Sequence, residues 1–153
     1  RTASGVSGVF CRHAVRATVF VTGPEAAPAG HYWWDRHAAG GVRVDAARFL
    51  DQSDVFDVAH HTRRHLVVGT DPSDLQALDH PTRPWLAYPF GELGSDPANS
   101  ASLARAAGFT AAFTTQPGFA RPQTERWLLP RVALYDAPLD GLLMRLLGLM
   151  DQA

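Results

Sequence analysis

Apolar residues along this chain of 153 residues gather in short, nearly continuous runs separated by stretches rich in polar residues, Gly and Pro. Four runs, at residues 15–23, 55–59, 85–88 and 109–115, are built largely from β-branched, aromatic and small apolar side chains. Runs of this length and composition are typical of strands that are buried on both faces of a parallel sheet. A fifth run, at residues 128–134, predicts a final strand.

Helices are predicted between these runs, from capping residues and from apolar positions at helical spacing. Asp71 and Asp74 offer N-cap side chains to a short helix. Asn99 and Ser100 do the same for a longer one, which Gly108 would end in the left-handed conformation. The expected helices are residues 45–50, 75–78, 99–106 and 139–150. Strands that alternate with helices predict an α/β fold in which a parallel sheet is covered on its faces.

Composition places the whole chain, residues 1–153, in a single globular domain. Hydrophobic residues make up 46% and charged residues 19%, which suits a packed core and not a disordered segment. The net charge of -1 and the scattered arginines leave no basic stripe, which argues against a nucleic-acid partner. Cys11 is the single cysteine, so an internal disulfide and a cysteine metal cluster are both excluded.

Nothing in the sequence has the length and apolar character of a membrane span. The most apolar run, residues 142–150, is interrupted by Arg145 and repeats like an amphipathic helix. Residues 1–8 lack an initiator Met and the charged-then-apolar plan of a signal peptide. We therefore expect no membrane span, leave the compartment open, and expect the chain to be the remainder of something longer or the product of an altered start.

His61 and His65 form the strongest candidate for chemistry, because they stand four residues apart directly after a predicted strand. If the chain turns helical there, the two imidazoles share one face and can grip one cation of the zinc, cobalt, nickel or iron type. The spacing alone favours an exposed or core histidine pair, whereas the position at the carboxyl end of a strand favours a site. His60 should point elsewhere, since neighbours in sequence do not share a face.

The segment at residues 57–65, with its His-Thr-Arg-Arg-His core, resembles the second motif of the polysaccharide deacetylases, the NodB-homology family. Four further segments are similar to family elements and follow in family order. Residues 16–23 resemble the second strand, and residues 87–91 the Tyr-Pro-Tyr/Phe-Gly motif. Residues 106–115 resemble the Ala-Gly-Phe…Thr-Thr stretch, and residues 129–132 the Leu-Pro-Arg-Ile element.

The resemblance runs from about Cys11 onward and implies an irregular, partial (β/α) barrel with its site at the carboxyl ends of the strands. It implies a hydrolase that removes acetyl groups from N-acetylated sugars, acting on carbon–nitrogen bonds that are not peptide bonds. In the family, two histidines and an aspartate hold a divalent metal, usually zinc, and a second aspartate is the general base. Carried over, His61 and His65 are the metal ligands, and Thr62 shapes their loop.

The resemblance also implies an oxyanion and substrate site on the next strand. The backbone N–H of Phe90 would help hold the tetrahedral oxyanion, Tyr88 belongs to the same wall, and Gly91 would permit the close turn. Arg131, from the last predicted strand, would face the same site as a cation in place of the general-acid histidine of the family, because no histidine follows His80.

The first family motif, Thr-Phe-Asp-Asp-Gly, has no counterpart in this chain. Residues 1–15 contain no Asp or Glu, and the first acidic residues are Glu25 and Asp35, beyond the first predicted strand. The first barrel strand is therefore expected to be missing or altered, and the catalytic base to be absent. Zinc should bind weakly if at all, because two neutral imidazoles lack an anionic third ligand. Ala87 also stands where many members carry an Arg that orients the base.

Three functions stay open at this point. The first is a deacetylase-like hydrolase of doubtful activity, as a piece of a longer chain or a degraded copy, with an N-acetylated glycan as its substrate. The second is a non-catalytic carbohydrate-binding pseudoenzyme, and the third a plain α/β domain whose histidines bind a regulatory metal. A carboxylate beside the histidine pair would discriminate between the first two, and the candidates near in sequence are Asp35, Asp54 and Asp57.

Other conspicuous residues favour ordinary structural roles. Trp33 and Trp34 could stack on sugar faces, but packing is the favoured interpretation. Arg63 and Arg64 could contact an anionic polymer, but a solvated loop face is favoured. A barrel that lacks a strand exposes a hydrophobic edge, so self-association is a reasonable expectation.

Overall fold

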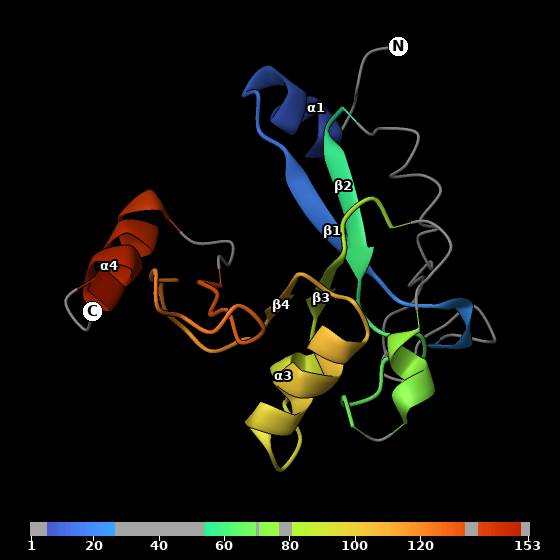
Figure 1. Ribbon diagram of the computed structural model, residues 1–153. Helices are drawn as coiled ribbons and strands as arrows, with labels where there is room; N and C mark the ends of the chain where they lie inside the picture. The colour runs from blue at the N-terminus through green and yellow to red at the C-terminus, as the bar shows by residue number, and fades with distance from the viewer. Residues whose placement is uncertain (1–5, 27–53, 70, 77–80, 134–137, 151–153) are drawn as a thin grey trace, which may run out of the picture.

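The computed structural model describes residues 6–26, 54–69, 71–76, 81–133 and 138–150. Its centre is a parallel sheet of strands β1 (Ala17–Val21), β2 (Phe56–His60), β3 (Trp85–Ala87) and β4 (Ala111–Phe113). The strand order is β1-β2-β3-β4, so each strand pairs with its neighbour in sequence (Figure 1). The predicted α/β class with a parallel sheet is confirmed.

The strand register aligns the carboxyl ends of the four strands. Val21 lies opposite His60, His60 opposite Leu86, and Leu86 opposite Ala112. The residues that follow these positions therefore meet at one edge of the sheet, where parallel α/β folds build their sites.

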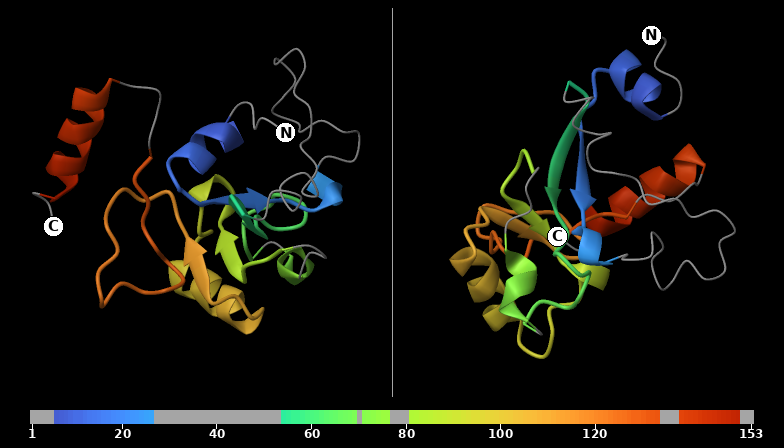
Figure 2. Two further views of the ribbon diagram at one scale, coloured as in Figure 1. Left: turned by 90° about the horizontal axis from the view of Figure 1, so that it is seen from above. Right: turned by 90° about the vertical axis from the view of Figure 1, so that its right-hand side faces the viewer.

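Helix α3 (Pro97–Ala106) covers one face of the sheet at β3 and β4 (Figures 1 and 2). Its N-cap is Asp96, whose side chain accepts a backbone hydrogen bond of 3.0 Å, so the prediction that Asn99 or Ser100 caps this helix is wrong. Pro97 explains the earlier start, because its fixed φ suits the first helical position. Gly108 follows the helix with φ +88°, the left-handed conformation expected of it.

A hydrophobic core fills the space between α3 and the sheet. Its fully buried members include Leu86, Tyr88 and Ala112, and the half-buried Trp127 closes one side by donating from Nε1 to the carbonyl of Phe109 at 2.8 Å. Each large apolar side chain buried here contributes about 1.5–3 kcal/mol relative to an exposed one. The core is made up of Val68, Leu75, Leu86, Tyr88, Ala104, Phe109 and Ala112.

Strand β1 differs from its prediction as a buried strand, since all five of its residues are only half-buried. It lies at the end of the described sheet, so one of its edges pairs with β2 and the other pairs with no described strand. The predicted strand at residues 128–134 is reduced to a single parallel bridge between Phe113 and Leu129 within the described residues. Helix α1 (Val6–Arg12) was not predicted.

The remaining helical elements are short, apart from the last. The described part of the chain contains the 3-10 turns η1 (Pro24–Ala26), η3 (Pro72–Leu75) and η4 (Pro89–Gly91). Asp71 does act as a cap, for η3, which ends at Leu75; residues 77–78 of the helix expected at residues 75–78 lie outside the described residues. Helix α4 (Leu139–Met150) forms as predicted and stands away from the sheet (Figure 1). Across the described residues, no helix combines the length and hydropathy needed to span a membrane.

Candidate functional site

The loop after β2 brings the two histidines together. The amide of His61 donates to the carbonyl of Val21 at 2.8 Å, which extends the β1–β2 ladder by one residue. The chain then passes through Thr62, with φ +62°, and reaches His65, with φ +58°. The expected helix is therefore absent here, and two left-handed residues take its place. They set the Nε2 atoms of His61 and His65 3.0 Å apart.

The carbonyl of Ala87 fixes the orientation of the His61 ring. Its oxygen lies 2.7 Å from His61 Nδ1, because the sheet register places the end of β3 beside the end of β2. A carbonyl can only accept, so Nδ1 must carry the hydrogen of the neutral ring. His61 Nε2 is then left with a lone pair directed at His65. This tautomer of His61, with the hydrogen on Nδ1, is the one found in histidines that bind a metal through Nε2.

Both imidazoles are held neutral. Burial lowers the pKa of His61; the hydrogen bond to the Ala87 carbonyl opposes this in part, and the nearby charge of Arg131 adds a smaller lowering effect. Burial lowers the pKa of His65 to about 4, helped by the repulsion that a protonated His61 would exert. Neutral imidazole is the form that can bind a metal.

The turn after β3 lies against this pair. Phe90 adopts φ +57°, and its ring meets the His65 ring edge-on with centroids 4.5 Å apart. Gly91 follows with φ +73°, and a Cβ at that position would come within 1.9 Å of Thr115 Oγ1. A glycine is therefore required twice over, by the backbone conformation and by the space. The two imidazoles thus lie at the end of β3, His65 against the Phe90 ring and His61 against the Ala87 carbonyl.

Tyr88 and Arg131 reach the site in different ways. The Tyr88 side chain is fully buried in the core, and its hydroxyl donates to the carbonyl of Trp127 at 2.9 Å. Its phenol therefore supports the turn from behind and does not face the histidines. Arg131 is half-buried, donates from Nε to the carbonyl of Thr114, and lies close enough to His61 to affect its pKa.

His60 points away from the pair, as predicted. Its ring is buried and meets the Phe109 ring with centroids 4.9 Å apart. Burial lowers the pKa of His60 to about 4, so this residue is a neutral histidine of the core.

Of the carboxylates named as candidates, the two that the structure describes do not join the histidines in a metal-binding group. Asp57 lies near the start of β2, where Arg16 and Arg83 bind it at 3.0 and 3.2 Å. Asp54 precedes that strand, and Asp35 lies outside the described residues, as do Trp33-Trp34 and the helix expected at residues 45–50. Within the described residues, no group of three His, Cys, Asp or Glu side chains could hold a metal.

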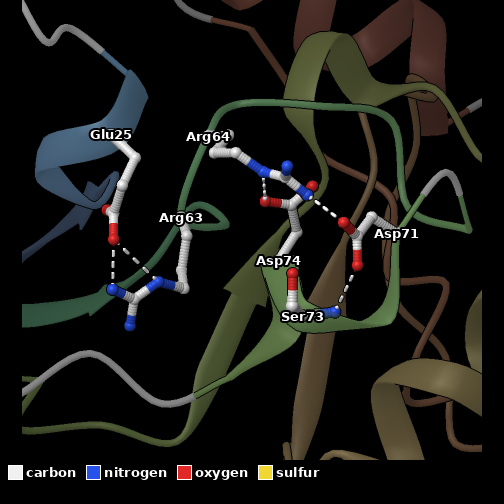
Figure 3. Close-up of polar contacts among 6 residues, drawn as sticks. All are labelled: Glu25, Arg63, Arg64, Asp71, Ser73 and Asp74. Carbon is white, nitrogen blue, oxygen red and sulfur yellow. Dashed lines mark hydrogen bonds and ion pairs between the residues drawn. The ribbon is translucent and has the colours of Figure 1, made fainter.

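Arg63 and Arg64 are partly exposed, with 31% and 38% of their side chains accessible, and both are ion-paired. Arg63 binds Glu25, which lies beyond the end of β1 (Figure 3). Arg64 binds Asp74 at 2.7 Å and Asp71 at 2.6 Å. The sequence carried a signal for this network in the two arginines that precede an Asp-Pro-Ser-Asp turn, but the sequence alone does not pair them.

The histidine pair fits a divalent metal in part. Two nitrogens that each lie about 2.0–2.1 Å from a tetrahedral zinc are about 3.3 Å apart. The observed separation of 3.0 Å is close to that value, and the His61 tautomer is the appropriate one. His61 and His65 could therefore share one cation, and a third protein ligand is not found in the described part of the chain.

Comparison with known proteins gives matches among solved structures, while no family model and no curated protein matches the chain. The deacetylase PplD of Streptococcus pyogenes, solved in complex with acetate, matches with a TM-score of 0.65 and 16% identity, covering 90% of this chain and 61% of PplD. BC0361, a polysaccharide deacetylase from Bacillus cereus, matches with a TM-score of 0.53 and 16% identity, covering 86% of this chain and 42% of its own.

BA0330 of Bacillus anthracis, provisionally described as a polysaccharide deacetylase, matches with a TM-score of 0.53 and 17% identity, covering 81% of this chain and 39% of its own. The chain thus spans less than two thirds of the length of each of these proteins, in line with the expected incomplete barrel. Its fold is that of the polysaccharide deacetylases, and the resemblance carried by its motifs is confirmed at the level of the fold.

Proposed function

We propose that this chain is a polysaccharide deacetylase-like domain in which His61 and His65 hold a divalent metal, most simply zinc, for hydrolysis of the acetamide of an N-acetylated sugar. The observation that carries the proposal is the facing pair of Nε2 atoms at 3.0 Å, with the ring of His61 oriented by the Ala87 carbonyl. The fold it shares with deacetylases of known structure supports the same substrate class.

A metal bound there would polarise the acetyl carbonyl and acidify a bound water. The residues of this chain would do the rest. His61 is held in the binding tautomer by Ala87, and the Phe90 ring packs against His65 and shields it on one side. The left-handed Phe90 turns the backbone at the position where the family directs an amide towards the oxyanion.

The missing component is a general base, and this sets the expected activity. Several described carboxylates are already ion-paired: Glu25 with Arg63, Asp57 with Arg16 and Arg83, and Asp71 and Asp74 with Arg64. With two imidazoles and no described carboxylate, we expect weak zinc binding and acetate release close to background.

Zinc titration of the purified chain tests the metal site, with acetate release from chitin oligomers as the assay of activity. We expect weak binding that is lost in His61→Ala and His65→Ala and kept in His13→Ala, a matched change of an exposed histidine near α1. Zinc binding that survives His61→Ala would overturn the proposal.

The same assays separate the alternatives. Steady metal-dependent acetate release that is lost in His61→Ala would show that the chain supplies a base after all. Binding of chitin oligomers that does not change when zinc is removed would identify the non-catalytic carbohydrate-binding alternative, and metal binding without glycan binding the regulatory one.

A further inference from the structure

We propose that Arg64, bound to Asp71 and Asp74, is a positioning residue that holds the histidine loop in its metal-binding shape. Its prediction about metal binding rests on the proposed function. Its prediction about the loop backbone rests on the loop geometry alone. The guanidinium of Arg64 binds two carboxylates, so Arg64 would act through the backbone of the loop that carries both histidines.

The contacts of Arg64 form a two-pronged clamp. Nε donates to Asp74 Oδ1 at 2.7 Å, and Nη2 donates to Asp71 Oδ2 at 2.6 Å (Figure 3). Asp71 is itself fixed, because its other oxygen accepts from the amide of Ser73 at 2.9 Å as the cap of η3. Charged hydrogen bonds of this length to two carboxylates define the guanidinium plane far better than one exposed ion pair would.

Asp74 is the buried partner in the clamp. Its side chain is only 3% exposed, while that of Arg64 is 38% exposed. Its second oxygen, Oδ2, is buried and meets no hydrogen-bond donor in the described part of the chain. A buried carboxylate in that setting needs its guanidinium partner, so the position of Asp74 dictates where Arg64 must lie. The Asp74 carbonyl also accepts from the amide of Arg63 at 3.0 Å, which ties the two backbones together.

The neighbouring arginine holds the opposite side of the loop. Arg63 reaches Glu25 beyond β1, and the amide of Gly23 donates to the carbonyl of Thr62 at 3.1 Å. Figure 3 shows the two guanidiniums directed to opposite sides, towards η1 and towards η3. The loop is thus fixed between the ends of two separate segments.

Such a clamp has a physical reason in the loop backbone. Thr62 and His65 are both left-handed, and each costs about 1–2 kcal/mol relative to an ordinary conformation. A strained conformation persists only when the surroundings enforce it. The distance between the two Nε2 atoms depends on the backbone dihedral angles of these two residues. Releasing the loop would therefore let the imidazoles move apart.

Arg64→Gln is the principal test, and Arg16→Gln is its matched control. Arg16 also forms an exposed ion pair to a β2 carboxylate, Asp57, but near the amino end of the strand. We expect Arg64→Gln to weaken cobalt and zinc binding about tenfold and to change the visible spectrum of bound cobalt. In the metal-free chain it should speed amide hydrogen exchange at Arg63 and Gly23, and Arg16→Gln should change none of these.

Two further variants keep the outcome decisive. Arg64→Lys retains the charge but cannot bridge both carboxylates, so it should restore the cobalt spectrum and the affinity only in part. Asp71→Asn removes one of the two ion pairs of Arg64 at an exposed position. It replaces Arg64→Gln as the test if that variant does not fold. Unchanged exchange and unchanged metal affinity in both Arg64→Gln and Asp71→Asn would overturn the clamp. If the wild-type chain binds no metal, the proposed function fails, and the exchange measurement still decides the clamp.

Discussion

Two neighbouring segments at the carboxyl edge of the sheet, the β2 loop at residues 61–65 and the β3 turn at residues 88–91, share an unusual backbone. Both contain non-glycine residues in the left-handed region: Thr62 and His65 in the loop, and Phe90 in the turn. The loop is held by partly exposed ion pairs, whereas the turn is held by the buried core. The left-handed backbone is thus stabilised by ion pairs in the loop and by packing in the turn.

The difference predicts which part of the site responds to solution conditions. The turn is supported by the buried Tyr88 and by the close contact between Gly91 and Thr115, which depend on packing. The loop is supported by Arg64 and its carboxylates, whose interactions depend on salt and pH. The following changes test that comparison, from the largest expected effect to the smallest.

Gly91→Ala should cause the largest loss of stability, about 3–4 kcal/mol in the free energy of unfolding by urea. The new Cβ would lie 1.9 Å from Thr115 Oγ1, and the φ of +73° adds a left-handed penalty. Gly108→Ala is the matched control, because Gly108 has φ +88° but no atom within 4 Å of the new Cβ. It should cost only about 1 kcal/mol, and equal losses in the two variants would contradict the role of packing at the turn.

Tyr88→Phe should cost about 1–2 kcal/mol at neutral pH, because the Trp127 carbonyl loses its donor. Burial raises the pKa of Tyr88 to about 12, and the charge of Glu125 adds to this. The unfolded chain therefore loses this proton near pH 10, and the folded chain only near pH 12. Stability present below pH 10 should be lost as pH rises from about 10 to 12, and the variant should lack that part of the loss.

Acid should act on the loop before it acts on the turn. The Ser73 amide and then Arg64 lower the pKa of Asp71 to about 2 from its usual 3.8. The stabilising contribution of this carboxylate is complete above about pH 4 and is lost as pH falls towards about 2. Titration of Asp71 by NMR checks the low pKa, and an ordinary value in the wild type, or no rise in Arg64→Gln, would show that Arg64 does not hold it.

Added salt should have the smallest effect and should distinguish the two segments directly. Raising sodium chloride from about 0.05 to about 0.5 M screens exposed ion pairs. Amide exchange at Arg63 in the loop should become about twofold faster, while exchange at Gly91, which donates to the Tyr88 carbonyl at 3.0 Å, should not change. Equal responses at both amides would mean that the ion pairs do not support the loop.

Much of the fold could be predicted because it depends on local patterns. The apolar runs predicted β1 to β4 and their parallel class, and the amphipathic stretch at residues 139–150 predicted α4. The predictions that failed depended on context. The helix α3 begins at Pro97, with Asp96 as its N-cap, because Pro favours the first helical position, and β1 is half-buried because of its place at the end of the described sheet.

For the candidate site, the sequence by itself identified the residues that the proposal uses. The spacing of His61 and His65 and the motif around Phe90 and Gly91 are local properties of the chain, visible without coordinates. Only the tertiary structure decided how they meet, because the sheet register places Ala87 beside His61. That contact joins residues 26 positions apart in the chain.

The tertiary structure also decided what holds the site together. The sequence showed Arg63 and Arg64 between the histidines but could not name their partners, since charges of either sign are distributed along the chain. Folding brought Glu25 to one and Asp74 to the other. Side-chain chemistry is therefore a property of the sequence, whereas the pairing of charges distant in sequence depends on three-dimensional packing and has no local signal.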